Sequence, residues 1–323
     1  MLNPLRIKFC ESMNQKKVVI TGGAGFIGSN LADELINENQ VIIIDDLSTG
    51  TLDNIAKIIT KENVKFVEES ILNRELLEKI FQDADIVFHE AAITSVARSI
   101  DDPRLANEIN IKGTLNVLMA ARDEKIKKVV FASSSAVYGD AVVLPIKENM
   151  IINVQSPYAL TKLTGEYYCR LFNELYGLPT ICLRYFNVYG PRQNPNSEYS
   201  AVIPSFISSV SKGYAPTIYG DGNQTRDFVF VKDVVQANIV AADSEATGVF
   251  NIGSGNSTTI NNLARNITAI LGRKIKPTYK KARVGEVRNS LADLTSANSI
   301  GYVPKYTLEY GLKETIENIK FSD

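Results

Sequence analysis

The stretch Val18-Val19-Ile20-Thr21-Gly22-Gly23-Ala24-Gly25-Phe26-Ile27-Gly28 decides the fold of this chain. Its apolar first part predicts a buried strand, and a helical pattern follows over residues 29–38. Between them the glycines satisfy two patterns, Gly23-x-Gly25-x-x-Gly28 and Gly22-x-x-Gly25-x-x-Gly28. Glycine lets backbone N–H groups approach a pyrophosphate at a helix N-terminus, where the helix dipole favours anions. The stretch therefore predicts the phosphate-binding turn of a strand–helix–strand unit.

Outward from this turn, apolar strands alternate with amphipathic helices. Continuous apolar strands predict a parallel sheet that is buried on both faces. Ser156, Pro157 and Gly177 are placed to cap, begin and end the longest helix. The expected strands are 18–21, 41–44, 64–67, 85–89, 129–132 and 180–183, and the expected helices are 29–38, 74–81, 107–123 and 158–176. The fold class is therefore α/β, with a Rossmann-type doubly wound parallel sheet.

Beyond Arg184 the pattern changes, because glycine and proline become frequent and the expected elements become short. This composition predicts a smaller, irregular α+β domain that binds substrate. An apolar run over 249–252 could return to the sheet. The expected division is a leader at 1–16, a nucleotide-binding domain at 17–186 with a return near 229–256, and a second domain at 187–228 and 257–323.

Composition excludes several classes of protein. The chain has 323 residues, 35 Lys and Arg against 36 Asp and Glu, one histidine and three cysteines. The nearly neutral charge argues against nucleic-acid binding, and the single histidine argues against a metal centre, so no metal is expected. The chain contains no apolar run long enough for a membrane span and no signal-peptide pattern, so we expect a cytoplasmic protein without membrane contact.

Asp45 ends the second expected strand, 20 residues after Gly25. A carboxylate at this point accepts hydrogen bonds from both hydroxyl groups of an adenosine ribose and repels a 2′-phosphate. The pattern therefore predicts NAD, in preference to NADP, as the cofactor.

Tyr158 has a lysine four residues later, Lys162, and on a helix this spacing puts both side chains on one face. An ammonium group and a helix N-terminus both stabilise a phenolate, so we expect the pKa of Tyr158 to fall toward neutrality. A tyrosine base beside NAD can take a hydroxyl proton while hydride leaves the same carbon. A serine in the run Ser133-Ser134-Ser135 could hydrogen-bond the reacting oxygen.

Together these motifs resemble the extended short-chain dehydrogenase/reductase superfamily, specifically its NAD-dependent epimerase/dehydratase family. The motifs are TGGAGFIG at 21–28, DDLSTG at 45–50, SSSAVYG at 133–139, SPYALTK at 156–162, RYFNVYG at 184–190 and GDGNQTRDF at 220–228. The resemblance implies Ser134, Tyr158 and Lys162 as catalytic residues. Ser70 stands where the family usually has an aspartate that faces the adenine amino group. The cofactor-binding residues implied by the resemblance are Gly22, Gly25, Phe26, Ile27, Gly28, Asp45, Asp46, Ser48, Thr49, Gly50, Ser70, Ile71, Ala91, Ala92, Asn110, Tyr158, Lys162 and Tyr185.

The branch of the family can be chosen from the two positions after the catalytic serine. Dehydratases that resemble this chain carry acidic residues there, and related decarboxylases carry a glutamate at the second. Here Ser135 and Ala136 cannot perform that acid–base chemistry. The resemblance therefore points to an isomerase, a UDP-hexose 4-epimerase. The alternatives are another nucleotide-sugar dehydratase or oxidoreductase, and a catalytically silent NAD-binding sensor, which would have lost its Ser-Tyr-Lys set.

For the UDP-sugar, the resemblance implies substrate contacts by Ser134, Ser135, Asn187, Ala201, Val202, Ile203, Tyr219, Arg226, Arg283, Glu286 and Ser290. Arginine side chains suit phosphate oxygens, so Arg226 and Arg283 are the expected diphosphate clamp. Residues 273–288 hold seven positive residues and one negative. We interpret Lys274, Lys276, Lys280 and Lys281 among them as a solvated basic face.

Ser290, in GEVRNSLAD at 285–293, stands where epimerases confined to unacetylated sugars resemble one another in carrying a tyrosine. The run NPNSEYSAVIP at 194–204 also looks more like the N-acetylhexosamine epimerases. We therefore expect UDP-N-acetylglucosamine and UDP-N-acetylgalactosamine to be interconverted, with UDP-glucose and UDP-galactose as weaker substrates. Which sugar is physiological is left open.

Relatives pair the helices that correspond to 107–123 and 158–176 in a four-helix bundle, so a homodimer is expected. The apolar residues for this surface are Leu115, Leu118, Met119, Leu163, Tyr167 and Leu171. His89 is interpreted as a packed, hydrogen-bonded residue, and Cys169 and Cys182 as small buried apolar residues.

Overall fold

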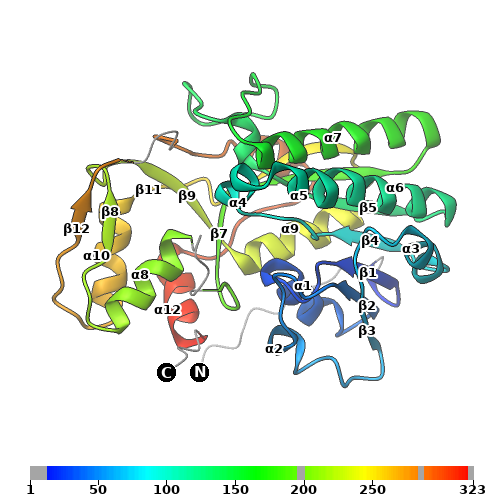
Figure 1. Cartoon of the computed structure of the whole chain (residues 1–323), viewed down its shortest axis with the longest axis horizontal. Coiled ribbons are helices and arrows are strands. Elements are labelled where there is room, and N and C mark those ends of the chain that lie inside the picture. Colours follow the sequence, from blue (N-terminus) through cyan, green and yellow to red (C-terminus); the bar gives the residue numbers. More distant parts are fainter. Residues whose placement is uncertain (1–12, 195–200, 283–286, 319–323) are drawn as a thin grey trace.

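Two parts of unequal size make up the protein, which is described here by a computed structural model (Figure 1). The structure describes residues 13–194, 201–282 and 287–318. The larger part is a parallel sheet with helices on both faces, and the smaller part holds short strands with helices packed around them. The α/β Rossmann-type fold class is therefore confirmed. No helix among the described residues is both long enough and apolar enough to cross a membrane.

The central sheet has seven strands in the order β10-β6-β5-β4-β1-β2-β3, and every neighbouring pair is parallel. The order reverses between β1 and β4, so the sheet is doubly wound and has its switch point there. Ligands of such sheets bind beyond the carboxyl ends of the strands at the switch point. The strands are β1 (Lys17–Thr21), β2 (Gln40–Asp45), β3 (Val64–Glu68), β4 (Ile86–His89), β5 (Lys128–Ser134), β6 (Thr180–Tyr185) and β10 (Gly248–Ile252).

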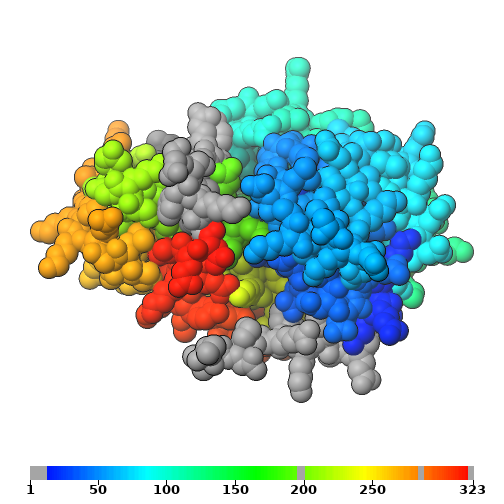
Figure 2. All heavy atoms as spheres, turned by 90° about the horizontal axis from the view of Figure 1, so that it is seen from below, coloured from blue at the N-terminus to red at the C-terminus, as the bar shows by residue number. Residues whose placement is uncertain are grey.

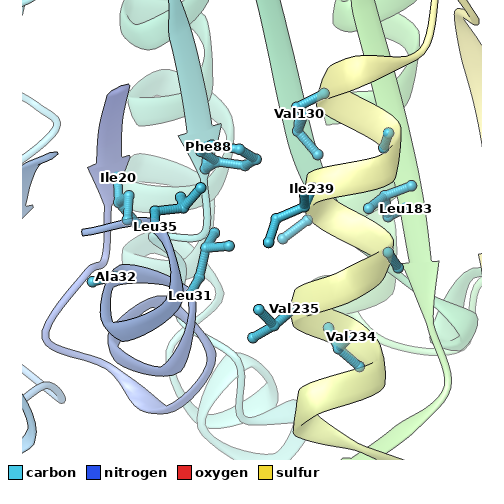
Figure 3. Packing of buried hydrophobic residues seen from close by; sticks show 14 of the residues in the cluster. Ile20, Leu31, Ala32, Leu35, Phe88, Val130, Leu183, Val234, Val235 and Ile239 are labelled. Atoms are coloured by element: carbon cyan, nitrogen blue, oxygen red, sulfur yellow. The ribbon is translucent and has the colours of Figure 1, made fainter. Parts of the chain in front are cut away.

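Alternate residues of these strands bury their side chains on opposite faces. Ile20 packs on the face that α1 (Phe26–Leu35) and α9 (Val231–Asp243) cover, as Figure 3 shows. Val19 packs on the other face, under α3 (Arg74–Phe81), α6 (Thr114–Asp123) and α7 (Pro157–Tyr176). Burying one such side chain contributes about 1.5–3 kcal/mol. The apolar strands seen in the sequence therefore hold both helical layers.

The longest helix begins and ends as its sequence predicts. The Ser156 hydroxyl accepts a hydrogen bond from the Ala159 N–H, Pro157 occupies the first turn, and Gly177 closes the helix at φ +68°. The expected helix at 107–123 is corrected: it consists of α5 (Pro103–Asn107), the π-helix η2 (Glu108–Gly113) and α6. The helix expected at 29–38 begins earlier and ends at Leu35.

The end of the expected leader is also corrected. Met13 is buried in the core beneath α1, and the Gln15 N–H donates to the carbonyl of Glu38. Residues 13–16 are therefore packed against the fold and not frayed. Residues 1–12, with Cys10, lie outside the described chain.

The smaller part has its own apolar core and two small sheets. One sheet joins β7 (Asn187–Tyr189), β9 (Thr225–Phe230) and β11 (Ser257–Thr259), and the other joins β8 (Thr217–Tyr219) and β12 (Thr278–Lys280). Helices α8 (Val202–Ser211), α10 (Ile260–Ile270) and α12 (Leu308–Asn318) cover them. In Figure 2, the blue segments of the sheet part and the red α12 lie on the same face, with green and yellow chain between them.

The chain passes between the two parts several times. It leaves the large sheet after β6, returns through α9 and β10, and leaves again at β11. The expected return of 249–252 to the sheet is confirmed, because β10 pairs with β6 over its whole length. The exact division into domains stays a prediction.

Candidate active site

The glycine turn after β1 brings α1 very close to the sheet. Gly22 has φ +70°, and a Cβ atom there would lie 2.7 Å from the backbone of Ala91. A Cβ atom on Gly28 would lie 2.3 Å from the carbonyl oxygen of Gly22. Residues with a side chain would therefore not fit at Gly22 or Gly28. The N-terminus of α1 is accessible to solvent, because Gly25, Phe26 and Ile27 are part-exposed. This geometry suits an anionic group.

The Asp45 carboxylate lies beside this turn at the end of β2. Its oxygens accept hydrogen bonds from the backbone N–H groups of Ala24 and Leu47, both at 2.9 Å. Burial raises its pKa, while those N–H groups lower it. Gly50 passes so close that a Cβ atom there would lie 2.8 Å from the carboxylate. The carboxylate is thus fixed at the edge of the sheet and retains acceptor capacity for two hydroxyl groups.

The neighbouring expected cofactor residues lie around the same edge. Asp46 accepts hydrogen bonds from the N–H and the hydroxyl of Ser48. The side chains of Asp46, Ser48 and Thr49 are all exposed. The Ser70 hydroxyl accepts from the Leu72 N–H at 3.3 Å. Ile71 is buried beneath Gly113 of the π-helix.

Asn110, in the π-helix, joins the loop after β4 to α7. Its Oδ1 accepts from the Ile93 N–H at 2.8 Å, and its Nδ2 donates to the Thr161 hydroxyl at 3.0 Å. π-Helical turns often occur at functional sites. Through Asn110, the edge that holds Ala91 and Ala92 is connected to the helix that carries Tyr158.

Ser134, Tyr158 and Lys162 come together where β5 ends beneath α7. The Ser134 hydroxyl and the Tyr158 phenol are hydrogen-bonded. The Lys162 ammonium donates to the Ala132 carbonyl at 2.7 Å and lies 5.1 Å from the centre of the Phe131 ring. The structure therefore assembles the three residues that the sequence singled out.

The expected direction of the Tyr158 pKa is wrong for the protein alone. Burial raises the pKa of the phenol above its usual value, and the negative charge of Glu90 raises it further. The hydrogen bond from Ser134 lowers it, but by less than burial raises it. Burial also disfavours the charged form of Lys162 and therefore lowers the pKa of the lysine to about 8. Desolvation is the largest influence on the pKa of both groups.

Two functional features escaped the sequence analysis. Glu90, directly after β4, accepts a hydrogen bond from the Tyr185 hydroxyl at 2.8 Å, and Asn238 of α9 donates to the same hydroxyl at 2.8 Å. Burial raises the pKa of Glu90 to about 7. The available signal was a glutamate immediately after an apolar strand, at the edge where ligands of such sheets bind.

The second missed feature is a buried ion pair behind Tyr158. Arg184 at the end of β6 donates from Nε and Nη2 to the two Glu166 oxygens of α7, at 2.8 and 2.6 Å. Its Nη1 donates to the Tyr138 hydroxyl at 2.7 Å. Breaking such a pair by removing one partner costs about 3–5 kcal/mol. The pair therefore fixes α7 against β6 and against the loop that begins at Ser134.

Ser134 and Ser135 lie at the end of β5, and the other expected substrate residues within the described chain belong to the smaller part. Asn187 and Ala201 are exposed, Val202 and Tyr219 are part-buried, and Ile203 is buried. Arg226 Nη1 donates to the carbonyl of Thr225 at 2.8 Å. Arg283 and Glu286 are not described, nor are residues 195–200.

The basic segment and Ser290 have different environments. Lys274, Lys276, Lys280 and Lys281 are exposed, which confirms a solvated basic face. Ser290 is 7% exposed, and its hydroxyl accepts from the Asp227 N–H at 3.4 Å.

The arrangement can therefore hold a dinucleotide along the edge of the sheet and present a phenol and a serine hydroxyl to a sugar bound from the smaller part. Among the described residues, no three His, Cys, Asp or Glu side chains cluster as a metal site requires. Tyr158, which is hydrogen-bonded to Ser134, is placed for proton transfer.

Residues 18–253 match the NAD dependent epimerase/dehydratase family. A putative UDP-glucose 4-epimerase of Methanocaldococcus jannaschii is 44% identical over 94% of this chain and 98% of its own length. A UDP-N-acetyl-alpha-D-glucosaminuronate decarboxylase of Bacillus cytotoxicus is 36% identical over 94% of this chain and 97% of its own length.

Several solved structures are similar to this chain in sequence and in fold. A UDP-N-acetylglucosamine 4-epimerase of Methanobrevibacter ruminantium, in complex with UDP-N-acetylmuramic acid, has a TM-score of 0.92 and 44% identity over 94% of this chain and 98% of that one. A UDP-glucose 4-epimerase of Thermotoga maritima with UDP-glucose has a TM-score of 0.89 and 41% identity over the same shares. The UDP-glucose 4-epimerase of Thermus thermophilus, solved with NAD, has a TM-score of 0.84 and 33% identity, again over 94% of this chain and 98% of that one.

His89 generates a prediction at this site. It is buried, and hydrogen bonds join its Nδ1 to the Thr21 hydroxyl (2.8 Å) and its Nε2 to the Thr114 hydroxyl (2.9 Å), which confirms its interpretation as a packed residue. Burial, with the nearby Lys162 charge, lowers the pKa of His89 to about 3. Because this is the only histidine in the chain, ¹³Cε1 labelling gives one NMR signal to follow. We expect no titration between pH 8 and pH 5, and a midpoint near the ordinary 6.5 would contradict the buried neutral ring.

Proposed function

The chain belongs to the NAD-dependent epimerase/dehydratase family and is an NAD-dependent UDP-sugar 4-epimerase, and on that basis we propose that it interconverts UDP-N-acetylglucosamine and UDP-N-acetylgalactosamine. The observation that carries the reaction type is the contact between Ser134 and Tyr158 above the buried Lys162. Ser135 and Ala136, in the 3₁₀ turn η3 (Ser135–Tyr138), supply no acid that could drive loss of water or carbon dioxide. This favours epimerisation over the dehydratase and decarboxylase chemistry of related proteins. The complete Ser-Tyr-Lys set argues equally against a silent NAD-binding sensor.

The residues present fit NAD. The backbone at Gly22 leaves no room for a Cβ atom, the N-terminus of α1 is open, and the Asp45 carboxylate is held beside it. We propose that the glycine turn binds the pyrophosphate and that Asp45 binds the adenosine ribose. NAD when bound accepts and returns the hydride of the reaction. Tyr185 and Lys162 would border the reacting end of the cofactor.

In this mechanism Tyr158 removes the proton of the C4 hydroxyl as the C4 hydrogen leaves as hydride, which produces a 4-keto sugar. Ser134 hydrogen-bonds the C4 oxygen throughout. The keto sugar then turns about its bond to the diphosphate, and the hydride is added to its other face. Tyr158 returns its proton to the oxygen, so no net oxidation occurs.

The substrate would be held from the smaller part. We propose that Arg226 and Arg283 bind the diphosphate, with Asn187 donating beside them. Tyr219 and the start of α8 would hold the uridine. We propose that Ser135 and Glu286 also contact the substrate.

Tyr158→Phe tests the mechanism. The change removes the phenol hydroxyl and keeps the ring, so we expect turnover to fall at least about 100-fold, the lower end for general-base catalysis. Tyr167→Phe on the exposed face of α7 is the matched control and should retain full turnover. Epimerisation is measured by NMR of the UDP-sugar, without added cofactor. Near-normal turnover by purified Tyr158→Phe would refute the assigned base.

The preference for acetylated sugars rests on Ser290. Its N–H donates to the Thr225 carbonyl at 3.2 Å, so this segment is fixed beside the strand that carries Arg226. A serine leaves room for an N-acetyl group that a tyrosine ring would fill. The M. ruminantium structure, whose bound ligand also has an acetylated sugar, supports the same preference.

Ser290→Tyr should therefore suppress conversion of the acetylated pair while it spares UDP-glucose and UDP-galactose. A missing or surplus methylene-sized volume changes specificity about 10–200-fold, and a tyrosine ring should reach at least the upper part of this range. The measurement is the ratio of kcat/KM for the two pairs, with Ser290→Ala as a control that adds no bulk. An unchanged ratio would remove Ser290 as the gate, and wild type without acetylated turnover would identify a plain UDP-glucose 4-epimerase.

We also propose a homodimer through α6 and α7. An apolar stripe of Leu160, Tyr167, Leu171 and Leu175 is exposed along one face of α7. The expected contribution of Leu118 is corrected, because this residue is fully buried in the core beneath α6. Leu115, Met119 and Leu163 are part-buried at the edge of the same surface.

Light scattering should give the mass of two chains, each 35.6 kDa, at micromolar concentration. Leu171→Glu with Leu175→Glu should give single chains, because two charges would be buried in the proposed interface. Leu52→Glu is the control. Leu52 is an exposed leucine of α2 (Leu52–Ile55), which connects β2 to β3 at the end of the sheet away from β5 and β6. A wild-type mass of one chain would refute the dimer.

We further propose a cytoplasmic location, since Cys169 and Cys182 are buried free thiols.

A further inference from the structure

Lys162 is a buried cation whose charge needs compensation. It is 3% exposed, and its ammonium group donates a hydrogen bond to a neutral group, the carbonyl of Ala132. Burial is the largest influence on its pKa and lowers it to about 8. A buried ammonium is retained only if nearby groups stabilise its charge. The question is which group does so.

The titratable groups that face Lys162 come from α7 and from the end of β4. On α7 itself, the Glu166 carboxylate already pairs with Arg184, and the Cys169 thiol lies in the core. Tyr158 on α7 and His89 on β4 are neutral. The remaining one is Glu90, which directly follows His89, and His89 pairs with Phe131, the residue before the Ala132 carbonyl that Lys162 binds. Glu90 has no ion pair within the part of the chain that the structure describes, and its charge raises the pKa of Lys162 more than any other group does.

The Glu90 carboxyl group is held in one place by the fold. It accepts the hydrogen bond of the Tyr185 hydroxyl, and that hydroxyl accepts in turn from the Asn238 amide. Tyr185 and Asn238 are both buried, and they belong to β6 and α9. The end of β4, β6 and α9 therefore converge to fix one carboxyl group beside the reaction centre. In the sequence alone, Glu90 is only a residue between a strand and a loop.

We propose that Glu90 is a positioning residue of the reaction, which supplies the fixed counter-charge that keeps Lys162 in its ammonium form. This proposal rests on the proposed function, because it assigns Glu90 a part in the same reaction. Glu90 does not exchange protons with the sugar. Its charge acting directly on Tyr158 raises the pKa of the phenol. Its favourable effect on the reaction therefore comes through Lys162, whose ammonium form favours the Tyr158 phenolate.

The proposal has a consequence that depends on pH. Below pH 7 Glu90 is mostly protonated, since burial raises its pKa to about 7, so removing its charge should change little there. Above pH 7 the carboxylate raises the proton affinity of Lys162. Without it, Lys162 should lose its proton at lower pH, and the alkaline limb of the kcat/KM profile should move to lower pH by about one unit, the lower end for a neighbouring charge.

Glu90→Gln tests this, because glutamine keeps an oxygen that accepts from Tyr185 and loses only the charge. The ratio of wild-type to variant kcat/KM should rise roughly tenfold between pH 6 and pH 9. Glu90→Asp keeps a carboxylate and should restore the alkaline limb. Glu62→Gln, an exposed glutamate in the loop before β3, is the matched control for charge and should show no shift. A ratio that is constant over this range means a merely structural role and overturns the proposal.

A second measurement is independent of turnover. In protein labelled at lysine ¹³Cε, the Lys162 signal is assigned by its loss in Lys162→Met, and its titration midpoint is followed in the NAD-bound enzyme. The midpoint should fall in Glu90→Gln, and also in Glu90→Met should the glutamine variant not fold. An unchanged midpoint overturns the proposal. If wild type converts no UDP-sugar, the proposed function fails, and the lysine titration still decides the role of Glu90.

Discussion

Parallel pairing of β1, β4, β5 and β6 is the constraint on which the rest of the site depends. Because these strands run in one direction, their carboxyl ends lie at one edge of the sheet, and the residue after each strand faces the same space. Gly22 and Glu90 directly follow β1 and β4, and Ser134 and Tyr185 are the last residues of β5 and β6. The pairing persists only because helices cover both faces of apolar strands. The catalytic edge is therefore a result of core packing on both sides of the sheet.

Buried charge is the second organising feature, and the protein handles it in two ways. Arg184 and Glu166 form a direct forked pair, which ties β6 to α7. Lys162 has no such ion pair among the described residues, and it is stabilised by a carbonyl and by the charge of Glu90. In the first arrangement, the hydrogen bonds and the charge of Glu166 outweigh burial and raise the pKa of Arg184. The second responds to pH near neutrality, which suits a group that must influence a proton transfer.

The smaller part reaches the site because the chain crosses to it repeatedly. Asp227, fully buried in β9, accepts hydrogen bonds from the N–H groups of Ser254, Gly255 and Ala292. One carboxylate thus joins the strand of Arg226 to the loop after β10 and to the segment that follows Ser290. The proposed diphosphate contact and the proposed specificity residue are consequently parts of one connected unit.

The sequence by itself determined the features that depend on local chemistry. The glycine turn, the acid at the end of β2, the Tyr-x₃-Lys spacing and the cap at Ser156 each follow from the conformation of a few successive residues, and the structure contains all four. Only the tertiary structure decided the direction of the Tyr158 pKa, because burial depends on every element packed around the phenol. The same holds for Glu90, Asn238 and Arg184, whose partners lie 95, 53 and 18 residues away in the chain. No local pattern records such contacts, since the sheet and its helices must first form to bring these side chains together.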